Sequence, residues 1–247
     1  MNPLILNSNQ FARHPDIVFG ISTRIGGVSP EPYGMNTSFK VGDESSNVRR
    51  NREIFMNQLG ILEKQLAIPR QIHGDTVLCV KEAGVYESCD ALITNQTNLY
   101  LTVSTADCVP IFLYHPPSES IAAIHSGWRG CRKNIIGKAL SSLEWEFSAK
   151  PREILAFIGP SARRCCYEIG EDVAVQFDEV FVVRRNGKAF LDLLGLTRHQ
   201  LLEVGLFPEN IEVSQHCTIC KDKLFHSFRR DRYRSGRMMG LIGRRSR

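Results

Sequence analysis

Short runs of apolar residues, each bounded by turn-forming residues, recur along most of this chain. Such runs are typical of buried β-strands. We therefore predict strands at residues 17–21, 76–80, 91–94, 101–104, 109–114, 121–125, 155–158, 211–214 and 238–243.

Four other segments carry apolar residues at helical spacing. We predict helices over residues 47–59, 133–147, 171–177 and 198–204. Residues 23–34 are rich in Gly, Pro and Ser, which predicts a loop. Strands and helices are mixed throughout, and no linker, repeat or low-complexity segment divides them. We therefore expect one α/β-type domain over residues 1–247.

Composition narrows the class of protein. A chain of 247 residues with 43% hydrophobic content can bury one sizeable core. No window approaches 18 uninterrupted apolar residues, so we expect no membrane span. Residues 1–7 have neither the basic nor the apolar part of a secretory signal. Eight cysteines without such a signal predict reduced thiols in a cytoplasmic protein.

The net charge of +5 is concentrated near the end of the sequence. Residues 229–247 hold eight Arg and one Asp, a net of +7, so the rest of the chain carries −2. A basic segment of this kind could bind nucleic acid. The predicted strand at residues 238–243 interrupts it, which favours an ordered strand with Arg-rich flanks. We expect a monomer and do not favour a nucleic-acid partner.

Three short segments each place one good transition-metal ligand beside small or turn-forming residues. The ligands are His73, Cys108 and His125, separated by 35 and then 17 residues. Two histidines and one thiolate can form a catalytic zinc site, which keeps its fourth position open. These separations are too long for a zinc finger, so a fold must bring the ligands together.

Two other kinds of site use the same residues. Cys108 could be the nucleophile of a thiol hydrolase, with His73 or His125 as its base. Two histidines and one cysteine could also form a copper site in a phenol oxidase. A multi-copper laccase needs many histidines, and this chain has seven, none of them in a His-x-His pair.

The segment Cys217-Thr218-Ile219-Cys220 is a lone CxxC pair. Such a pair can be half of a zinc site or a redox pair. The chain has no second CxxC, and we interpret Cys165 and Cys166 as ordinary core or surface residues. The sequence therefore predicts no structural zinc site here, and we expect a Cys220→Ser variant to keep its metal content.

The three ligand-bearing segments read Gln-Ile-His-Gly at 71–74, Thr-Ala-Asp-Cys-Val-Pro at 105–110 and His-Ser-Gly-Trp-Arg-Gly at 125–130. They resemble motifs of the bacterial YfiH/YlmD family, formerly DUF152 or "polyphenol oxidase/laccase domain" proteins. The resemblance covers nearly the whole chain. Further matching motifs follow in order at 22–29, 41–43, 51–52, 90–94, 158–160, 167–170, 190–193, 217–218, 225–230 and 235–237.

The resemblance implies a single domain with an α-β-β-α layered sandwich, and zinc on His73, Cys108 and His125. It implies a purine nucleoside phosphorylase of the FAMIN type, with purine nucleosides and phosphate as substrates. Inosine and adenosine would be cleaved to free base and ribose 1-phosphate, with methylthioadenosine as a further candidate and with adenosine deaminase activity. Copper stays an alternative metal. In this family Cys217-Thr218 belongs to the common pattern and Cys220 does not.

Phosphorolysis requires a cation that holds phosphate. The planar guanidinium of arginine binds two phosphate oxygens at once. Arg24, Arg52 and Arg129 lie in or near the matched motifs and are our candidates, with Arg129 assigned to the catalytic group.

Deamination requires a general acid or base that is not a metal ligand. Asp75 and Asp107 are the carboxylates nearest the ligands in sequence, although neighbouring side chains of an extended segment point to opposite faces. On the resemblance alone, Asn36 and Ser38 are expected to contact the sugar or the base.

Overall fold

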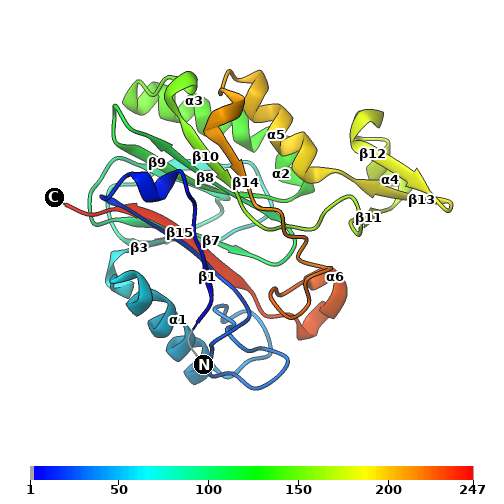
Figure 1. Cartoon of the computed structure of the whole chain (residues 1–247), viewed down its shortest axis with the longest axis horizontal. Coiled ribbons are helices and arrows are strands. Elements are labelled where there is room, and N and C mark those ends of the chain that lie inside the picture. Colours follow the sequence, from blue (N-terminus) through cyan, green and yellow to red (C-terminus); the bar gives the residue numbers. More distant parts are fainter. Residues whose placement is uncertain (1–2, 247) are drawn as a thin grey trace.

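Two six-stranded β-sheets stack face to face in the computed structural model, which describes residues 3–246 (Figure 1). The strand order of the first sheet is β1-β2-β15-β7-β3-β5. Its strands are β1 (Ile5–Leu6), β2 (Ile17–Ser22), β15 (Met238–Arg244), β7 (Tyr100–Thr105), β3 (Leu66–Pro69) and β5 (Gly84–Tyr86).

The second sheet has the order β14-β10-β8-β9-β6-β4. Its strands are β14 (Ile211–Val213), β10 (Leu155–Ile158), β8 (Val109–His115), β9 (Ser120–Ser126), β6 (Ala91–Thr94) and β4 (Val77–Cys79). A small third sheet projects at one side of the molecule in Figure 1. It contains β11 (Glu168–Ile169), β13 (Lys188–Leu191) and β12 (Val182–Arg185).

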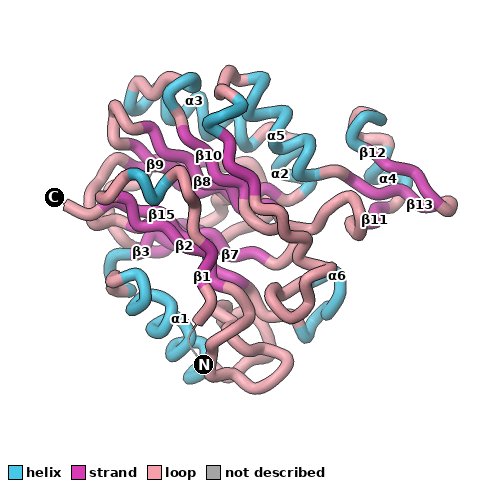
Figure 2. Tube along the Cα trace, viewed as in Figure 1, coloured by secondary structure: helices cyan, strands magenta, loops and turns pink. Residues whose placement is uncertain are grey.

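Helices cover the outer faces of the two large sheets (Figure 2). Helix α1 (Ser45–Leu59) packs on the first sheet, and α3 (Ile135–Phe147) and α5 (Leu193–Glu203) pack on the second. Three helices are short: α2 (Trp128–Arg132), α4 (Glu171–Ala174) and α6 (Phe228–Asp231). The predicted α-β-β-α layering is confirmed. None of the helices within residues 3–246 has the length and apolar character that a membrane crossing requires.

Strand β9 explains why the sequence reads as continuous apolar runs. Ile121 and Ala123 belong to the core between the two sheets, whereas Ala122 and Ile124 belong to the core under α3. Successive side chains of a strand point to opposite faces, so a strand covered on both sides is apolar at every position.

The last strand lies in the middle of the first sheet. β15 pairs antiparallel with both β2 and β7, as predicted for a buried strand. Arg244 at its end is buried, and it pairs with Asp16 at 3.1 Å and Glu119 at 2.6 Å. Part of the Arg-rich segment is thus tied into the fold.

Two predicted helices need correction. The helix expected over residues 171–177 ends at Ala174, because only that residue of the turn is buried and Val175 is exposed. The helix expected over 198–204 begins five residues earlier, at Leu193. There the Asp192 side chain accepts a hydrogen bond from the amide of Gly195 at 2.9 Å and caps the first turn.

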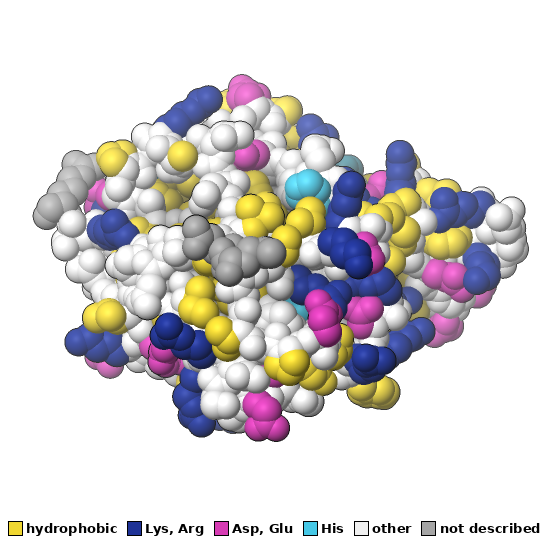
Figure 3. Space-filling model, turned by 60° about the horizontal axis from the view of Figure 1, so that its bottom comes forward, with side chains coloured by type: hydrophobic (Ala, Val, Ile, Leu, Met, Phe, Trp, Pro, Cys, Tyr) yellow, Lys and Arg dark blue, Asp and Glu magenta, His cyan; other side chains and the backbone are white. Residues whose placement is uncertain are grey.

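Charged side chains of both signs are interspersed on the face shown in Figure 3. Lys and Arg (dark blue) lie close to Asp and Glu (magenta) on the right-hand half of that face. They do not form one continuous basic surface there. The absence of a nucleic-acid partner and the monomeric state stay predictions.

Candidate metal centre

The fold brings the three predicted ligands together. His73 comes from the β3–β4 loop, Cys108 from the turn between β7 and β8, and His125 from β9. One ligand atom from each lies within 4.8 Å of the others. The two imidazole rings are nearly perpendicular, at 85°, with centroids 4.8 Å apart. Because β7 and β8 belong to different sheets, the Cys108 turn places the site where the two sheets join.

Asp90, which is fully buried, organises the His73 loop. Its carboxylate accepts hydrogen bonds from the backbone amides of Ile72 at 3.1 Å, His73 at 3.0 Å and Gly74 at 2.7 Å. His73 has a left-handed backbone, with φ of 58°, which few residues other than glycine adopt. The three bonds to one carboxylate hold the loop in this conformation.

The same carboxylate orients the second histidine. Nδ1 of His125 lies 2.7 Å from Oδ1 of Asp90, so Nδ1–H donates to the carboxylate and Nε2 is left as the free donor atom for a metal. Burial raises the pKa of Asp90, but the bonds from His125 and from the Gly74 and Ile72 amides outweigh this and hold it below its usual value. Asp90 is a site residue that the sequence did not assign, although it begins one of the matched motifs.

The site favours the thiolate of Cys108. Burial raises the pKa of this thiol, but the charges and hydrogen bonds of His125 and His73 outweigh burial and lower the pKa to about 6. Burial likewise lowers the pKa of His125, whereas Cys108 and Asp90 raise it to about 9. The thiolate is the form of cysteine that binds metals.

Gly127 lies directly against the three candidate ligands. A Cβ atom added at Gly127 would lie 3.1 Å from Sγ of Cys108, 3.2 Å from Cδ2 of His73 and 4.0 Å from Cε1 of His125. Only glycine leaves this space open. Imidazole and thiolate donors suit zinc, and two histidines with one cysteine also suit copper. The residues therefore fit a metal site without fixing the identity of the metal.

Asp107 has both carboxylate oxygens engaged. It accepts hydrogen bonds from Oγ1 of Thr218 at 2.7 Å, Oγ of Ser227 at 3.0 Å and the backbone amide of Arg229 at 2.7 Å. These bonds join the Cys108 turn to two segments near the end of the chain. This geometry suits an anchor, and the predicted acid–base role of Asp107 stays a prediction.

Asp75 lies in the same loop as His73 and faces two lysines. It pairs with Lys138 and, at 3.5 Å, with Lys133. The hydrogen bond from Lys138 holds the pKa of Asp75 below its usual value, so the carboxylate is charged at neutral pH.

Two predicted phosphate ligands have carboxylate partners. Arg24 pairs with Glu31. Arg52 pairs with Glu63 at 3.4 Å and donates to the backbone carbonyl of Thr37 at 2.8 Å. Either guanidinium would have to leave a partner to take phosphate.

Arg129 is exposed, and its guanidinium lies 4.2 Å from the centroid of the Trp128 ring. Asn36 is fully buried, and its Oδ1 accepts from the amides of Ser38 at 3.0 Å and Arg237 at 2.9 Å. The substrate contacts expected of Arg129, Asn36 and Ser38 stay predictions.

Arg237 was not among the predicted residues, yet the charges of Asp107 and Cys108 act on it. Burial lowers the pKa of its guanidinium, while the charges of Asp107 and Cys108 raise it. Within the described residues, its guanidinium donates to the carbonyls of Ser235 and Gly236 and pairs with no carboxylate. The matched motif at 235–237 was the signal that could have identified it.

The fold and the site together define an α-β-β-α protein with a candidate mononuclear metal centre of two histidines and one cysteine. The family model for the multi-copper polyphenol oxidoreductase laccases matches residues 18–245. The chain belongs to this family, the YfiH/DUF152 group that the sequence motifs indicated.

Curated relatives are named for an activity other than that of a laccase. The chain is 32% identical to the purine nucleoside phosphorylase of Bacteroides thetaiotaomicron, over 96% of this chain and 95% of the relative. It is 32% identical to the purine nucleoside phosphorylase YlmD of Bacillus subtilis, over 92% and 88%. The crystal structure of the hypothetical protein YfiH of Bacillus licheniformis matches with a TM-score of 0.92 and 29% identity, over 98% of this chain and 97% of that one.

Proposed function

We propose that this protein is a zinc-dependent purine nucleoside phosphorylase. Its substrates would be inosine and adenosine, with methylthioadenosine as a further candidate, and it would also deaminate adenosine. The names of the curated relatives support the phosphorylase activity. The observation that carries the proposal is the convergence of His73, Cys108 and His125. Arg237 adds a guanidinium that forms no ion pair within the described residues and on which the charges of Asp107 and Cys108 act.

Phosphate would bind to guanidinium groups that no carboxylate already neutralises. Of the arginines considered, Arg129 and Arg237 form no ion pair within residues 3–246, although the charge of Asp107 acts on Arg237, whereas Arg24 and Arg52 have acidic partners. An arginine can hold two phosphate oxygens, which leaves another oxygen free to face C1′ of the ribose. The phosphate charge beside C1′ stabilises the oxocarbenium character that develops as the glycosidic bond breaks.

The leaving purine requires a proton or a positive charge near its nitrogen atoms. A bound zinc ion would supply Lewis acidity at its open position. Asp90 keeps Nδ1 of His125 protonated and both histidines oriented, so the ligand geometry is fixed before substrate binds. Deamination needs in addition a group that moves a proton between water and the base, and Asp75 and Asp107 are the candidates.

Two other functions use the same residues. A copper phenol oxidase agrees with the description of the family model and with a two-histidine, one-cysteine site. Within residues 3–246, the one other cluster that could hold a metal consists of four cysteines, which does not suit the copper centres of a laccase. A thiol hydrolase agrees with the low pKa of Cys108 beside His125.

One experiment distinguishes the three candidate functions. Purified protein of known metal content is incubated with inosine, with and without phosphate. We expect hypoxanthine and ribose 1-phosphate in equal amounts, dependent on phosphate and abolished by a Cys108→Ala substitution that also removes the zinc bound with His73 and His125. Equally fast release of the base without phosphate would indicate a hydrolase. Activity on phenols that requires copper, with none on nucleosides, would indicate an oxidase.

A further inference from the structure

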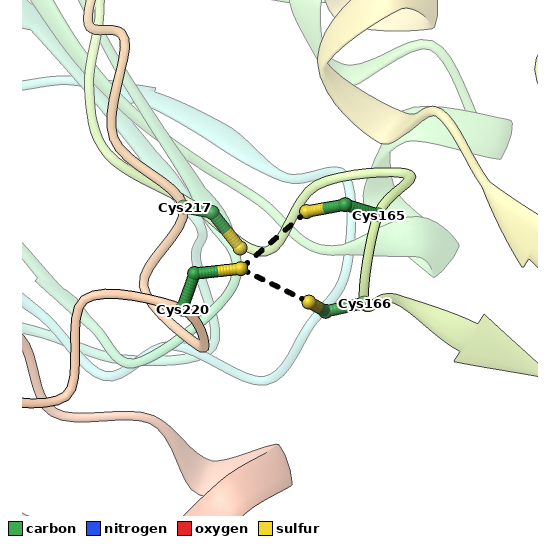
Figure 4. A group of neighbouring side chains, drawn as sticks. All are labelled: Cys165, Cys166, Cys217 and Cys220. Carbon is green, nitrogen blue, oxygen red and sulfur yellow. Dashed lines mark hydrogen bonds between the residues drawn. The ribbon is translucent and has the colours of Figure 1, made fainter.

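Four cysteines from two segments that are distant in the sequence converge in a second cluster (Figure 4). Cys165 and Cys166 lie in the turn before β11, and Cys217 and Cys220 follow β14. All four sulfurs lie within 4.8 Å of one another. Sγ of Cys220 is 3.6 Å from Sγ of Cys165 and 3.1 Å from Sγ of Cys166. The lone CxxC of the sequence thus has a partner pair in Cys165 and Cys166, which we had interpreted as ordinary residues, and we no longer expect Cys220→Ser to keep its full metal content.

The backbone builds this cluster from two tight turns. The amide of Lys221 donates to the carbonyl of Cys217 at 3.0 Å and closes the first turn.

The second turn explains how adjacent cysteines reach one site. In an extended segment, neighbouring side chains would point to opposite faces. Here the amides of Cys166 and Tyr167 both donate to the carbonyl of Arg163 at 2.8 Å, so the chain turns and both sulfurs face Cys220. Thr218 donates its amide to the carbonyl of Ser161 at 3.0 Å and ties the two turns together.

The sulfur positions fit one ion. Zinc binds cysteine sulfur at about 2.3 Å, so sulfurs at the corners of a tetrahedron around it lie about 3.8 Å apart. The spacings of 3.1 Å, 3.6 Å and up to 4.8 Å bracket this value. Four thiolates leave no open coordination position, which is the pattern of a structural zinc site.

We propose that Cys165, Cys166, Cys217 and Cys220 bind a second zinc ion as a closed tetrathiolate site. Its role is to hold the loop that anchors the candidate metal centre. Thr218 lies inside the CxxC turn and donates Oγ1 to Asp107, the residue next to Cys108. Arg230 donates to the carbonyls of Thr218 at 2.9 Å and Ile219 at 3.1 Å and holds the turn from the other side.

Zinc stoichiometry tests the proposal independently of activity. We expect two zinc ions per chain in the wild-type protein and one in a Cys165→Ser/Cys166→Ser double variant. We expect one also in His73→Ala, and none when both sets of substitutions are combined. Cys79→Ser removes an exposed cysteine outside the cluster and should keep two. A single zinc that is lost in His73→Ala and kept in the double variant would overturn the proposal.

Measurements on the His73→Ala protein cover the case in which the double variant does not fold. X-ray absorption at the zinc edge should show four sulfur ligands at about 2.3 Å. Cobalt substituted for zinc should give the charge-transfer absorption of thiolate ligands. Iron in place of zinc, or a disulfide between Cys166 and Cys220 in protein purified under reducing conditions, would contradict the proposal. A wild-type protein that holds the tetrathiolate zinc but no zinc at His73, Cys108 and His125 would instead count against the proposed phosphorylase centre.

Discussion

Oδ1 of Asp90 lies 2.7 Å from Nδ1 of His125, and both side chains are almost completely buried. The same carboxylate holds the amides of the His73 loop. One acidic residue therefore sets the orientation of two ligands that lie 52 positions apart in the sequence. Hydrogen bonds within the protein therefore orient both candidate ligands.

Replacing Asp90 should weaken metal binding although the ligands remain. In Asp90→Asn, an amide that cannot match the carboxylate faces His125 and three backbone donors. We expect zinc affinity to fall about 10- to 100-fold, measured by competition with a chelator. Asp172→Asn, at an exposed position, is the matched control. Unchanged affinity in Asp90→Asn would show that Asp90 does not organise the ligands.

A methyl group at Gly127 should act on the site without unfolding the protein. Its backbone, with φ of −77°, accepts alanine, but the new Cβ would press on Cys108 and His73 at 3.1 and 3.2 Å. Metal-ligand distances tolerate only about 0.2 Å of displacement. We expect Gly127→Ala to lower zinc affinity about tenfold while the unfolding temperature of the metal-free protein changes by less than about 2 °C. If the unfolding temperature of the metal-free protein also falls by well over about 2 °C, the substitution causes a general packing defect.

Arg237 should determine the use of phosphate. Losing a charge-assisted contact costs about 1.5–3 kcal/mol, which corresponds to a fall of about 10- to 150-fold in kcat/KM for phosphate. We expect this in Arg237→Gln, with adenosine deamination affected much less. Arg234→Gln removes an exposed arginine of the same segment and should behave as wild type. If Arg129→Gln shows the larger loss, Arg129 holds the phosphate.

The Asp107→Asn variant distinguishes an anchoring role of Asp107 from an acid–base role. In Asp107→Asn the amide would face three donors at Thr218, Ser227 and Arg229, so at least one hydrogen bond is lost. We expect a loss of about 2–4 kcal/mol, which lowers the unfolding temperature by roughly 5–15 °C. Asp222→Asn, at an exposed position, should leave it unchanged. Full stability with abolished deamination would assign Asp107 to proton transfer.

The sequence predicts the layers of this fold well because the two large sheets are covered on both faces. Strand β9 is apolar at most positions for that reason, and its bounds follow from composition. The small sheet of β11, β12 and β13 was missed, since its strands mix exposed charged residues with a few buried ones. Their apolar stretches, such as Val182-Val183 in β12 and Ala189-Phe190-Leu191 in β13, are short and adjoin charged residues.

The residues of the candidate site were likewise predicted only in part. His73, Cys108 and His125 could be selected because each lies at a turn beside small residues. Asp90 could not be assigned a role, because its bonds to the His73 loop and to His125 exist only after β6 and β9 pair. The sequence also did not predict that Cys165 and Cys166 join the CxxC pair. Cys165 and Cys166 are adjacent, and only the turn closed by Arg163 directs both toward Cys220.

His226 should make the stability of the protein depend on pH. It is fully buried, and burial, followed by the charges of Arg24, Arg237 and Arg230, lowers its pKa to about 3. In the unfolded chain its pKa is about 6.5, so between these values the unfolded state binds more protons. The contribution of His226 to the free energy of unfolding is therefore fully present above about pH 6.5. It is lost as the pH falls, by about 2 kcal/mol between pH 7 and pH 5.

Urea unfolding at pH 7 and pH 5 measures this effect. His226→Gln cannot take up the proton, so its stability should fall less than that of the wild type over the same interval, even if the variant is less stable at both pH values. The metal centre is common to both proteins, and the difference between the two pH dependences isolates His226. His199→Gln, at an exposed position, should keep the wild-type dependence. Identical pH dependences for His226→Gln and wild type would mean that His226 is protonated in the folded protein, and that the three neighbouring guanidinium groups do not act on it.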